Sequence, residues 1–215
     1  MPFYPNPGRC RGMRNGVVSI ILGGVGGQGL RVASRILGEA SVRAGFDVKI
    51  RESHGLAQRE GSVVSHVRIG KEVHSFLTPQ GTAQALVSLE MSEGARNIGY
   101  LRPNGVAILN DKLLYPVSYY TGEAVYPNKK WVLSAFKHYG AKLFLIDAES
   151  LAKKAGDLRS TNVVMLGALA ALDVLPFSSK FVLEAVRSVI PHSVDVNVRA
   201  FKLGIEAARS MDYET

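Results

Sequence analysis

The hydrophobic pattern of the chain alternates between short β-branched runs and longer stretches with helical spacing. The short runs predict strands at 17–22, 47–52, 62–69, 85–89, 105–110 and 141–147. Apolar stripes that recur every three to four residues predict helices at 30–44, 92–101, 129–139, 163–172, 182–189 and 194–208. Since strands that alternate with helices favour a parallel sheet, we expect an α/β fold. It is a Rossmann-like layered, mostly parallel sheet with flanking helices and C-terminal helices.

A glycine loop joins the first expected strand to the first expected helix. Residues 24–29 read Gly-Val-Gly-Gly-Gln-Gly and match the pattern G-x-G-x-x-G in a strand-to-helix context. Glycines let backbone N–H groups approach a phosphate, and the helix N-terminus adds partial positive charge. The ligand candidates are Gly24, Gly26, Gly27, Gln28 and Gly29. The alternative interpretation is that these glycines serve only close strand–helix packing.

The strand at 47–52 completes a βαβ pattern, for which we expect parallel strands and a right-handed crossover. It ends in Glu52, about 20 residues past the loop, where a nucleotide ribose would find its acidic partner. A stand-alone NAD- or FAD-binding oxidoreductase is therefore one candidate function. The polar loop that follows contains His54 and Arg59, both suited to a phosphate or carboxylate. The alternative is that both are ordinary loop residues.

Charge and length limit the functional classes. The chain has 215 residues and a net charge of +8, so its surface attracts anions. Residues 1–15 hold Arg9, Arg11 and Arg14 without an acidic residue, and we expect a mobile basic leader before a single domain at 16–215. A nonenzymatic basic interaction module is a further alternative. No apolar run reaches the roughly 18 residues of a membrane span, and the start does not resemble a signal peptide, so we expect a cytoplasmic protein.

Cysteine and histidine positions exclude several kinds of site. A single cysteine, Cys10, cannot form an internal disulfide, an iron–sulfur cluster with four thiolates or a Cys-rich zinc site. Four further histidines stand at no metal-ligand spacing, at positions 66, 74, 138 and 192. No Ser/His/Asp, HExxH or Walker pattern is present. We therefore assign no metal ligand and no catalytic residue.

Four segments carry a resemblance: the glycine loop, His54-Gly-Leu-Ala-Gln-Arg59, Gly61-Ser-Val-Val-Ser-His-Val-Arg-Ile-Gly70 and Leu89-Glu-Met-Ser-Glu-Gly-Ala-Arg96. Together they resemble one known family, the gamma-type subunits of 2-oxoacid:ferredoxin oxidoreductases, and within it the indolepyruvate branch. Asn162-Val-Val-Met-Leu-Gly167 also fits, and the resemblance runs from about Val17 to the C-terminal helices. One departure is Glu60, where the family pattern has a glycine.

The resemblance implies a share in oxidative decarboxylation, in which a 2-oxoacid, coenzyme A and oxidised ferredoxin give an acyl-CoA, carbon dioxide and reduced ferredoxin. It implies that thiamine diphosphate and iron–sulfur clusters belong to a larger partner subunit, and that this chain binds no cofactor alone and is inactive alone. It places the glycine loop in the coenzyme A region. Ferredoxin would meet the chain through the complex, and neither a membrane nor nucleic acid is expected as a partner.

The C-terminal helices suggest a further contact. Helix 163–172 is apolar on every side, and the last helix carries a second apolar stripe. Together they exceed what one small sheet face needs. We therefore expect part of this surface to meet a partner or a second copy of the chain.

Overall fold

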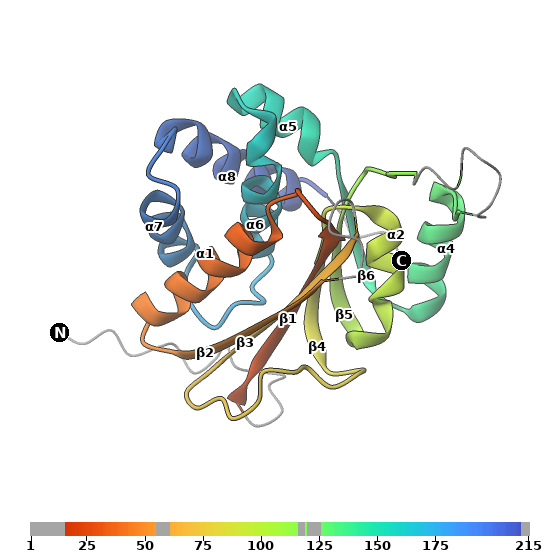
Figure 1. Ribbon diagram of the computed structural model, residues 1–215, viewed down its shortest axis with the longest axis horizontal. Helices are drawn as coiled ribbons and strands as arrows, with labels where there is room; N and C mark the ends of the chain where they lie inside the picture. The colour runs from red at the N-terminus through yellow and green to blue at the C-terminus, as the bar shows by residue number, and fades with distance from the viewer. Residues whose placement is uncertain (1–15, 55–60, 116–118, 120–125, 212–215) are drawn as a thin grey trace.

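The computed structural model describes residues 16–54, 61–115, 119 and 126–211. Six strands form one sheet in the order β2-β3-β1-β4-β5-β6 (Figure 1). They are β1 (Val18–Val25), β2 (Asp47–His54), β3 (Ser62–Gly70), β4 (Ala83–Ser88), β5 (Leu101–Asn110) and β6 (Lys142–Ile146). The pairs β1–β4, β4–β5 and β5–β6 are parallel, whereas β3 is antiparallel to both of its neighbours, β1 and β2. The expected mostly parallel α/β sheet is confirmed.

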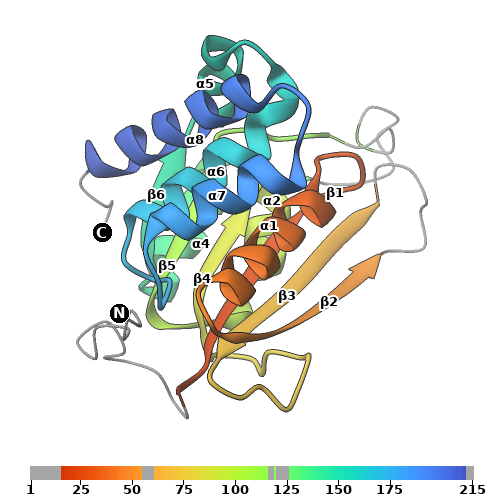
Figure 2. The ribbon, with the colours of Figure 1, turned by 90° about the vertical axis from the view of Figure 1, so that its left-hand side faces the viewer.

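Helices lie on both faces of this sheet (Figures 1 and 2). The first face carries α1 (Leu30–Arg43), α5 (Ala148–Ala155), α6 (Thr161–Ala171), α7 (Ser179–Val189) and α8 (Val194–Arg209). The second face carries α2 (Met91–Arg96) and α4 (Lys129–Tyr139), with the 3-10 turns η3 (Ile98–Tyr100) and η4 (Leu158–Ser160) in the connections. No helix in the described part of the chain is long and apolar enough to cross a membrane.

Two elements differ from the sequence-based expectation. The helix expected at 92–101 ends at Arg96, because η3 follows it and Leu101 already begins β5. The pattern gave no signal for α5, which has only eight residues. Its ends are nevertheless well defined, since the Asp147 carboxylate accepts the Ser150 N–H and Gly156 ends the helix in the left-handed conformation. A helix this short presents too few apolar positions for its period to be visible.

The β1–α1–β2 segment keeps the parallel direction that the βαβ pattern predicts, but β3 lies between the two strands. β2 and β3 pair along their whole length, from Asp47 opposite Gly70 to His54 opposite Val63. Consecutive strands pair antiparallel through a short connection, which costs less chain entropy than a crossover. The insertion moves β2 to the edge of the sheet, two strand spacings or about 10 Å from β1.

The apolar helix α6 is enclosed by the chain itself. Its residues from Asn162 to Leu169 are buried, and α1, α5, α7 and α8 pack around it. A Cβ on Gly167 would overlap the Phe201 carbonyl oxygen, and one on Gly204 would overlap the Val164 carbonyl oxygen. The two backbones approach so closely because each helix has a glycine at the contact. The fold itself therefore buries most of α6, and the expected contact with a partner or a second copy stays a prediction for the part of the α8 stripe that is only partly buried.

Replacing Gly204 with alanine should lower the free energy of unfolding by about 3 kcal/mol, because α6 and α8 must move apart to admit the methyl group. Gly38→Ala in α1 is the matched control, since its Cβ meets only the flexible Ile50 Cδ1, at 2.9 Å. There the gain in helix propensity, about 1 kcal/mol, should offset the small shift. Urea unfolding of both variants measures the difference, and equal effects would contradict the close helix contact.

Candidate functional site

The glycine loop occupies the carboxyl end of β1 and leads directly into α1. Gly27 has φ 93° and Gly29 has φ 78°, conformations that side chains with a Cβ rarely adopt. The Gly26 N–H donates to the Gly61 carbonyl at 2.9 Å, which ties the loop to the start of β3. A Cβ on Gly24 would lie 2.6 Å from the Gln28 Oε1. Gly24 and Gly26 therefore shape the turn, and the Gly26 N–H is already engaged.

Gln28 braces the loop against the neighbouring strand. Its Oε1 accepts the Val25 N–H at 2.9 Å, and its Nε2 donates to the Leu89 carbonyl at 3.2 Å, just beyond β4. The Leu89 N–H in turn donates to the Gly23 carbonyl at 2.9 Å. These bonds join the ends of β1 and β4, so that Gly27, Gln28 and Gly29 line an adjacent cleft.

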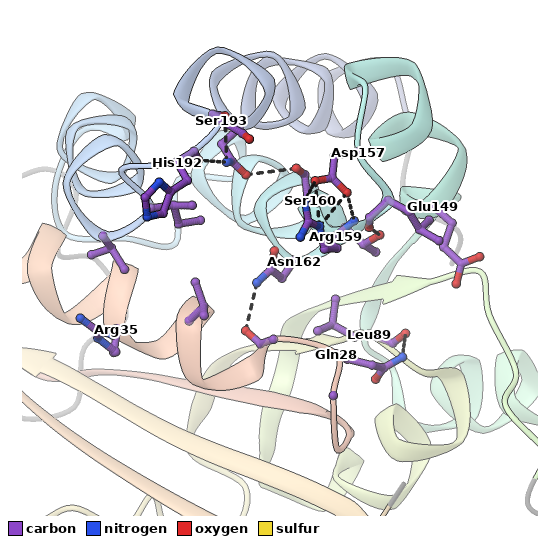
Figure 3. Close-up of a pocket in the computed structure, with 18 of the residues that line it drawn as sticks. Gln28, Arg35, Leu89, Glu149, Asp157, Arg159, Ser160, Asn162, His192 and Ser193 are labelled. Carbon is purple, nitrogen blue, oxygen red and sulfur yellow. Dashed lines mark hydrogen bonds and ion pairs between the residues drawn. The ribbon is translucent and has the colours of Figure 1, made fainter. Parts of the chain in front are cut away.

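This cleft, of about 670 Å³, lies between the N-termini of α1, α6 and α8 (Figure 3). The N-cap residues are Gly29, Ser160 and Ser193, and none of the three helices has a side-chain cap. Each helix start carries a partial positive charge, although at α6 the Thr161 N–H already donates to the Leu158 carbonyl of η4. Three such starts around one space favour a negatively charged ligand.

Asn162 joins two of these helix starts. It is 5% exposed, and its Nδ2 donates to the Gly29 carbonyl at 3.0 Å (Figure 3). Its Oδ1 is buried and has no hydrogen-bond partner among the described residues. An unsatisfied buried acceptor costs about 1 to 3 kcal/mol. The fold tolerates this cost at the wall of the cleft, where the amide fixes the last residue of the glycine loop.

The charged side chains around the cleft leave a positive balance. Arg159 pairs with Asp157 at 2.8 Å, and its hydrogen bonds hold the pKa of the Asp157 carboxyl below its usual value. Lys112 pairs with Glu149 at 3.1 Å. Arg35 is exposed on α1 and has no ion-pair partner among the described residues. The acidic side chains are thus offset locally, and Arg35 adds its charge to that of the helix starts.

Of the other expected ligand residues, the structure describes Glu52 and the backbone of His54. Glu52 accepts hydrogen bonds from Arg31 Nε at 3.2 Å and Ser34 Oγ at 2.8 Å, so α1 already engages this carboxylate. Because β3 separates β2 from β1, Glu52 does not take the place of a ribose partner beside the glycine loop. His54 is the last residue of β2, opposite Val63. Its side chain and the whole of Arg59 lie outside the described residues.

The sequence analysis missed the far wall of the cleft. Its polar groups come from the starts of α6 and α8 and from Arg35, far from the glycine loop along the chain. Helix starts without side-chain caps leave no motif, and α6 otherwise has the pattern of a core helix. The only signal was the resemblance carried by Asn162–Gly167. Within the described ranges, no group of three or more His, Cys, Asp or Glu could hold a metal ion.

The segment after β4 places a carboxylate in the interior near the cleft. Glu90 is fully buried, and its side chain accepts the N–H groups of Glu93 at 2.7 Å and Leu114 at 3.2 Å. Burial raises the pKa of Glu90 above its usual value, despite these hydrogen bonds. Glu90 thus caps α2 and holds the following chain in place. Its role in the described structure is to support the end of β4, and it does not line the cleft.

Comparison with known proteins identifies the family. The profile of the pyruvate ferredoxin/flavodoxin oxidoreductase family matches residues 19–207. The chain belongs to this family. It is 42% identical to indolepyruvate oxidoreductase subunit IorB of Thermococcus kodakarensis, over 90% of this chain and 96% of that protein. It is 36% identical to IorB of Methanothermobacter thermautotrophicus, over 88% of this chain and 97% of that protein. The resemblance based on the sequence motifs is confirmed.

Solved structures of this family share the fold. The gamma subunit of a keto/oxoacid ferredoxin oxidoreductase from Geobacter sulfurreducens superimposes with a TM-score of 0.67 at 26% identity, covering 90% of this chain and 99% of that one. A 2-oxoglutarate:ferredoxin oxidoreductase from Magnetococcus marinus gives a TM-score of 0.69 at 21% identity, covering 94% of this chain but 32% of that longer chain. The same fold therefore occurs both as a separate chain and as part of a longer chain.

Gly29→Ala should destabilise the protein more than Gly45→Ala. Both glycines have positive φ, but a Cβ at Gly29 would lie 2.6 Å from Asn162 Nδ2, whereas nothing lies within 4 Å of one at Gly45. We expect the free energy of unfolding to fall by about 1 kcal/mol in Gly45→Ala and by at least about twice that in Gly29→Ala. In an Asn162→Ala background the two costs should become similar. Chemical unfolding of the set measures this coupling, and its absence would contradict the contact.

Glu90→Gln should change the pH dependence of stability. The folded-state pKa of Glu90 is raised from 4.5, so between that value and the higher one the folded protein binds more protons than the unfolded chain. Wild-type stability therefore falls, relative to the Gln variant, as pH rises through this window. The substitution should therefore cost most at pH 4.5 and below, and progressively less as the pH rises above it. Urea unfolding over a series of pH values tests it, and a constant difference would contradict the raised pKa.

Proposed function

We propose that the chain is the small, cluster-free subunit of an indolepyruvate or closely related 2-oxoacid:ferredoxin oxidoreductase. The proposal rests on 42% identity to an archaeal IorB protein, with almost complete coverage of both chains. The complex would convert a 2-oxoacid, coenzyme A and oxidised ferredoxin into an acyl-CoA, carbon dioxide and reduced ferredoxin. The choice of 2-oxoacid would be made in the pocket of the partner that holds the thiamine.

In this proposal the redox chemistry belongs to a larger subunit that carries thiamine diphosphate and iron–sulfur clusters. A chain with one cysteine has too few thiolates for a cluster with four cysteine ligands. The small subunit would meet ferredoxin through the complex and would be inactive alone. A complex with such clusters belongs in a reducing compartment, and the cytoplasm is the proposed location.

We further propose that the cleft binds an anionic group of coenzyme A, a phosphate above all. The observation that carries this proposal is the convergence of three uncapped helix starts beside the glycine loop. Backbone N–H groups and helix dipoles bind phosphate without a dedicated lysine, and the exposed Arg35 adds a cation at the rim. The chain would thus bind and orient the acyl acceptor, while bonds are made and broken elsewhere.

The alternative of a stand-alone NAD or FAD enzyme has less support. Its ribose partner would be Glu52, which lies on β2, a strand that does not adjoin β1. The Glu52 carboxylate already accepts hydrogen bonds from Arg31 and Ser34 of α1. The alternative of a basic interaction module rested partly on the leader, which lies outside the described residues. Neither alternative explains the similarity to enzyme subunits over nearly the whole chain.

The complex with the larger subunit provides the test. Arg35→Ala should raise the KM for coenzyme A about tenfold while kcat and the KM for the 2-oxoacid stay within about twofold, because a charged hydrogen bond is worth about 1.5 to 3 kcal/mol. Arg43→Ala is the control, since Arg43 lies at the other end of α1 and pairs with Glu39. The wild-type chain alone should show no turnover. Equal KM values for both variants would contradict the proposed anion site.

A further inference from the structure

The second face of the β2–β3 pair is covered on its β3 side, where Ser62 donates to Glu93 of α2 and the buried His66 ring meets Tyr100 of η3 edge-on. Its β2 side, called the uncovered face below, has no helix over it among the described elements. α1 packs on the first face, where Val48 and Ile50 join the main core. On the second face, α2 lies over β1, β4 and β5 with α4 packed against it, away from β2 (Figure 1). The side chains that alternate with Val48 and Ile50 therefore point to the uncovered face.

These side chains are mostly basic. Lys49 lies directly opposite Arg68, and Arg51 lies opposite His66. Like charges in cross-strand pairs destabilise a sheet. Arg51 and burial both lower the pKa of His66, which relieves one pair by favouring the neutral imidazole. The pair of Lys49 and Arg68 remains: Arg68 is held by hydrogen bonds to the loop after β3, and Lys49 has no ion-pair partner among the described interactions.

Nearby acidic groups do not neutralise the face. The Asp47 carboxylate, at the start of β2, accepts the Val73 N–H at 2.9 Å. Glu72, in the loop after β3, is exposed and lies 3.6 Å from His74. Neither carboxylate makes an ion pair with Lys49, Arg51 or Arg68 among the described interactions. The uncovered face therefore keeps a positive charge.

Two large apolar side chains are held beside these cations. Phe76 is 53% exposed and Leu77 is 48% exposed, in the loop that connects β3 to β4. Arg68 Nη1 donates to the carbonyls of Ser75 at 3.0 Å and Leu77 at 3.2 Å, which fixes this loop on the sheet. Lys49 Nζ lies 6.0 Å from the centroid of the Phe76 ring. Exposed apolar side chains held by a fixed backbone lose little entropy on binding, which favours a docking role.

We propose that Lys49, Arg51, Arg68, Phe76 and Leu77 form a docking face for an acidic surface with an apolar centre on the larger subunit. This inference rests on the proposed function, since it requires that the chain works in a complex. The cations match an acidic partner, and Phe76 and Leu77 supply the apolar contact that stabilises a protein interface. A symmetric contact with a second copy would bring Lys49 and Arg51 against the same cations, so the charge disfavours it.

The test measures association of the purified chain with the purified larger subunit. The double variant Lys49→Glu/Arg51→Glu should weaken binding at least about tenfold, mainly through slower association, and should reduce the salt dependence of the affinity. The control variant Lys130→Glu/Lys137→Glu makes the same change of charge on exposed residues of α4, and it should bind within about twofold of wild type. Circular dichroism and melting temperature confirm that each variant folds.

Phe76→Ala provides a second, independent variant, because removal of an exposed loop side chain leaves the fold intact. It should weaken association about tenfold without changing the salt dependence, as loss of an apolar anchor predicts. If both test variants bind like wild type, or if the α4 control is weakened equally, the docking face is wrong while the subunit assignment stands. If the wild-type chain does not bind the larger subunit, both proposals fail. Loss of a wild-type homodimer in the test variants would assign the face to a second copy and overturn the proposed partner.

Discussion

The hydrogen bond from Asn162 to the Gly29 carbonyl links the two walls of the cleft. One wall is the glycine loop at the start of α1, and the other begins at α6, more than half the chain away in sequence. The bond can form only because Gly29 lacks a Cβ. It leaves the buried Asn162 Oδ1 without a hydrogen-bond partner among the described residues, which destabilises the folded state. The position of the loop relative to α6 therefore depends on a residue pair at which neither side tolerates change.

The close contact between α6 and α8 extends this arrangement to the third helix start. Gly167 and Gly204 bring the two backbones together, which places the start of α8 beside that of α6. The positive potential of the cleft then comes mostly from backbone N–H groups and helix dipoles that are fixed before a ligand arrives. Such groups need little reorganisation on binding, whereas a lysine would have to lose side-chain entropy. A cleft built in this way would suit the phosphate that we propose as its ligand.

The two faces of the sheet differ in what covers them. The first face is closed by helices and provides the cleft, while the β2–β3 part of the second face carries cations and apolar side chains toward solvent. The insertion of β3 accounts for both features. It moves Glu52 away from the glycine loop, which removes the dinucleotide-type ribose contact, and it builds a two-stranded edge that extends beyond α2 and α4. The position of β3 thus distinguishes this sheet from one in which β2 adjoins β1, and it leaves free the face that we propose for docking.

The sequence by itself determined the element types and the glycine loop, because both depend on local properties. Periods of two and near four follow from strand and helix geometry, and a strand-to-helix turn with positive φ at Gly27 and Gly29 requires glycine. It did not reveal α5, whose eight residues carry too short a pattern. Only the tertiary structure decided that β3 enters between β1 and β2, and that Asn162 and the starts of α6 and α8 complete the cleft. The strand order and the contact of Asn162 depend on residues far apart in the chain. The helix starts contribute backbone N–H groups, which every sequence has, so the cleft leaves no local signature in the sequence.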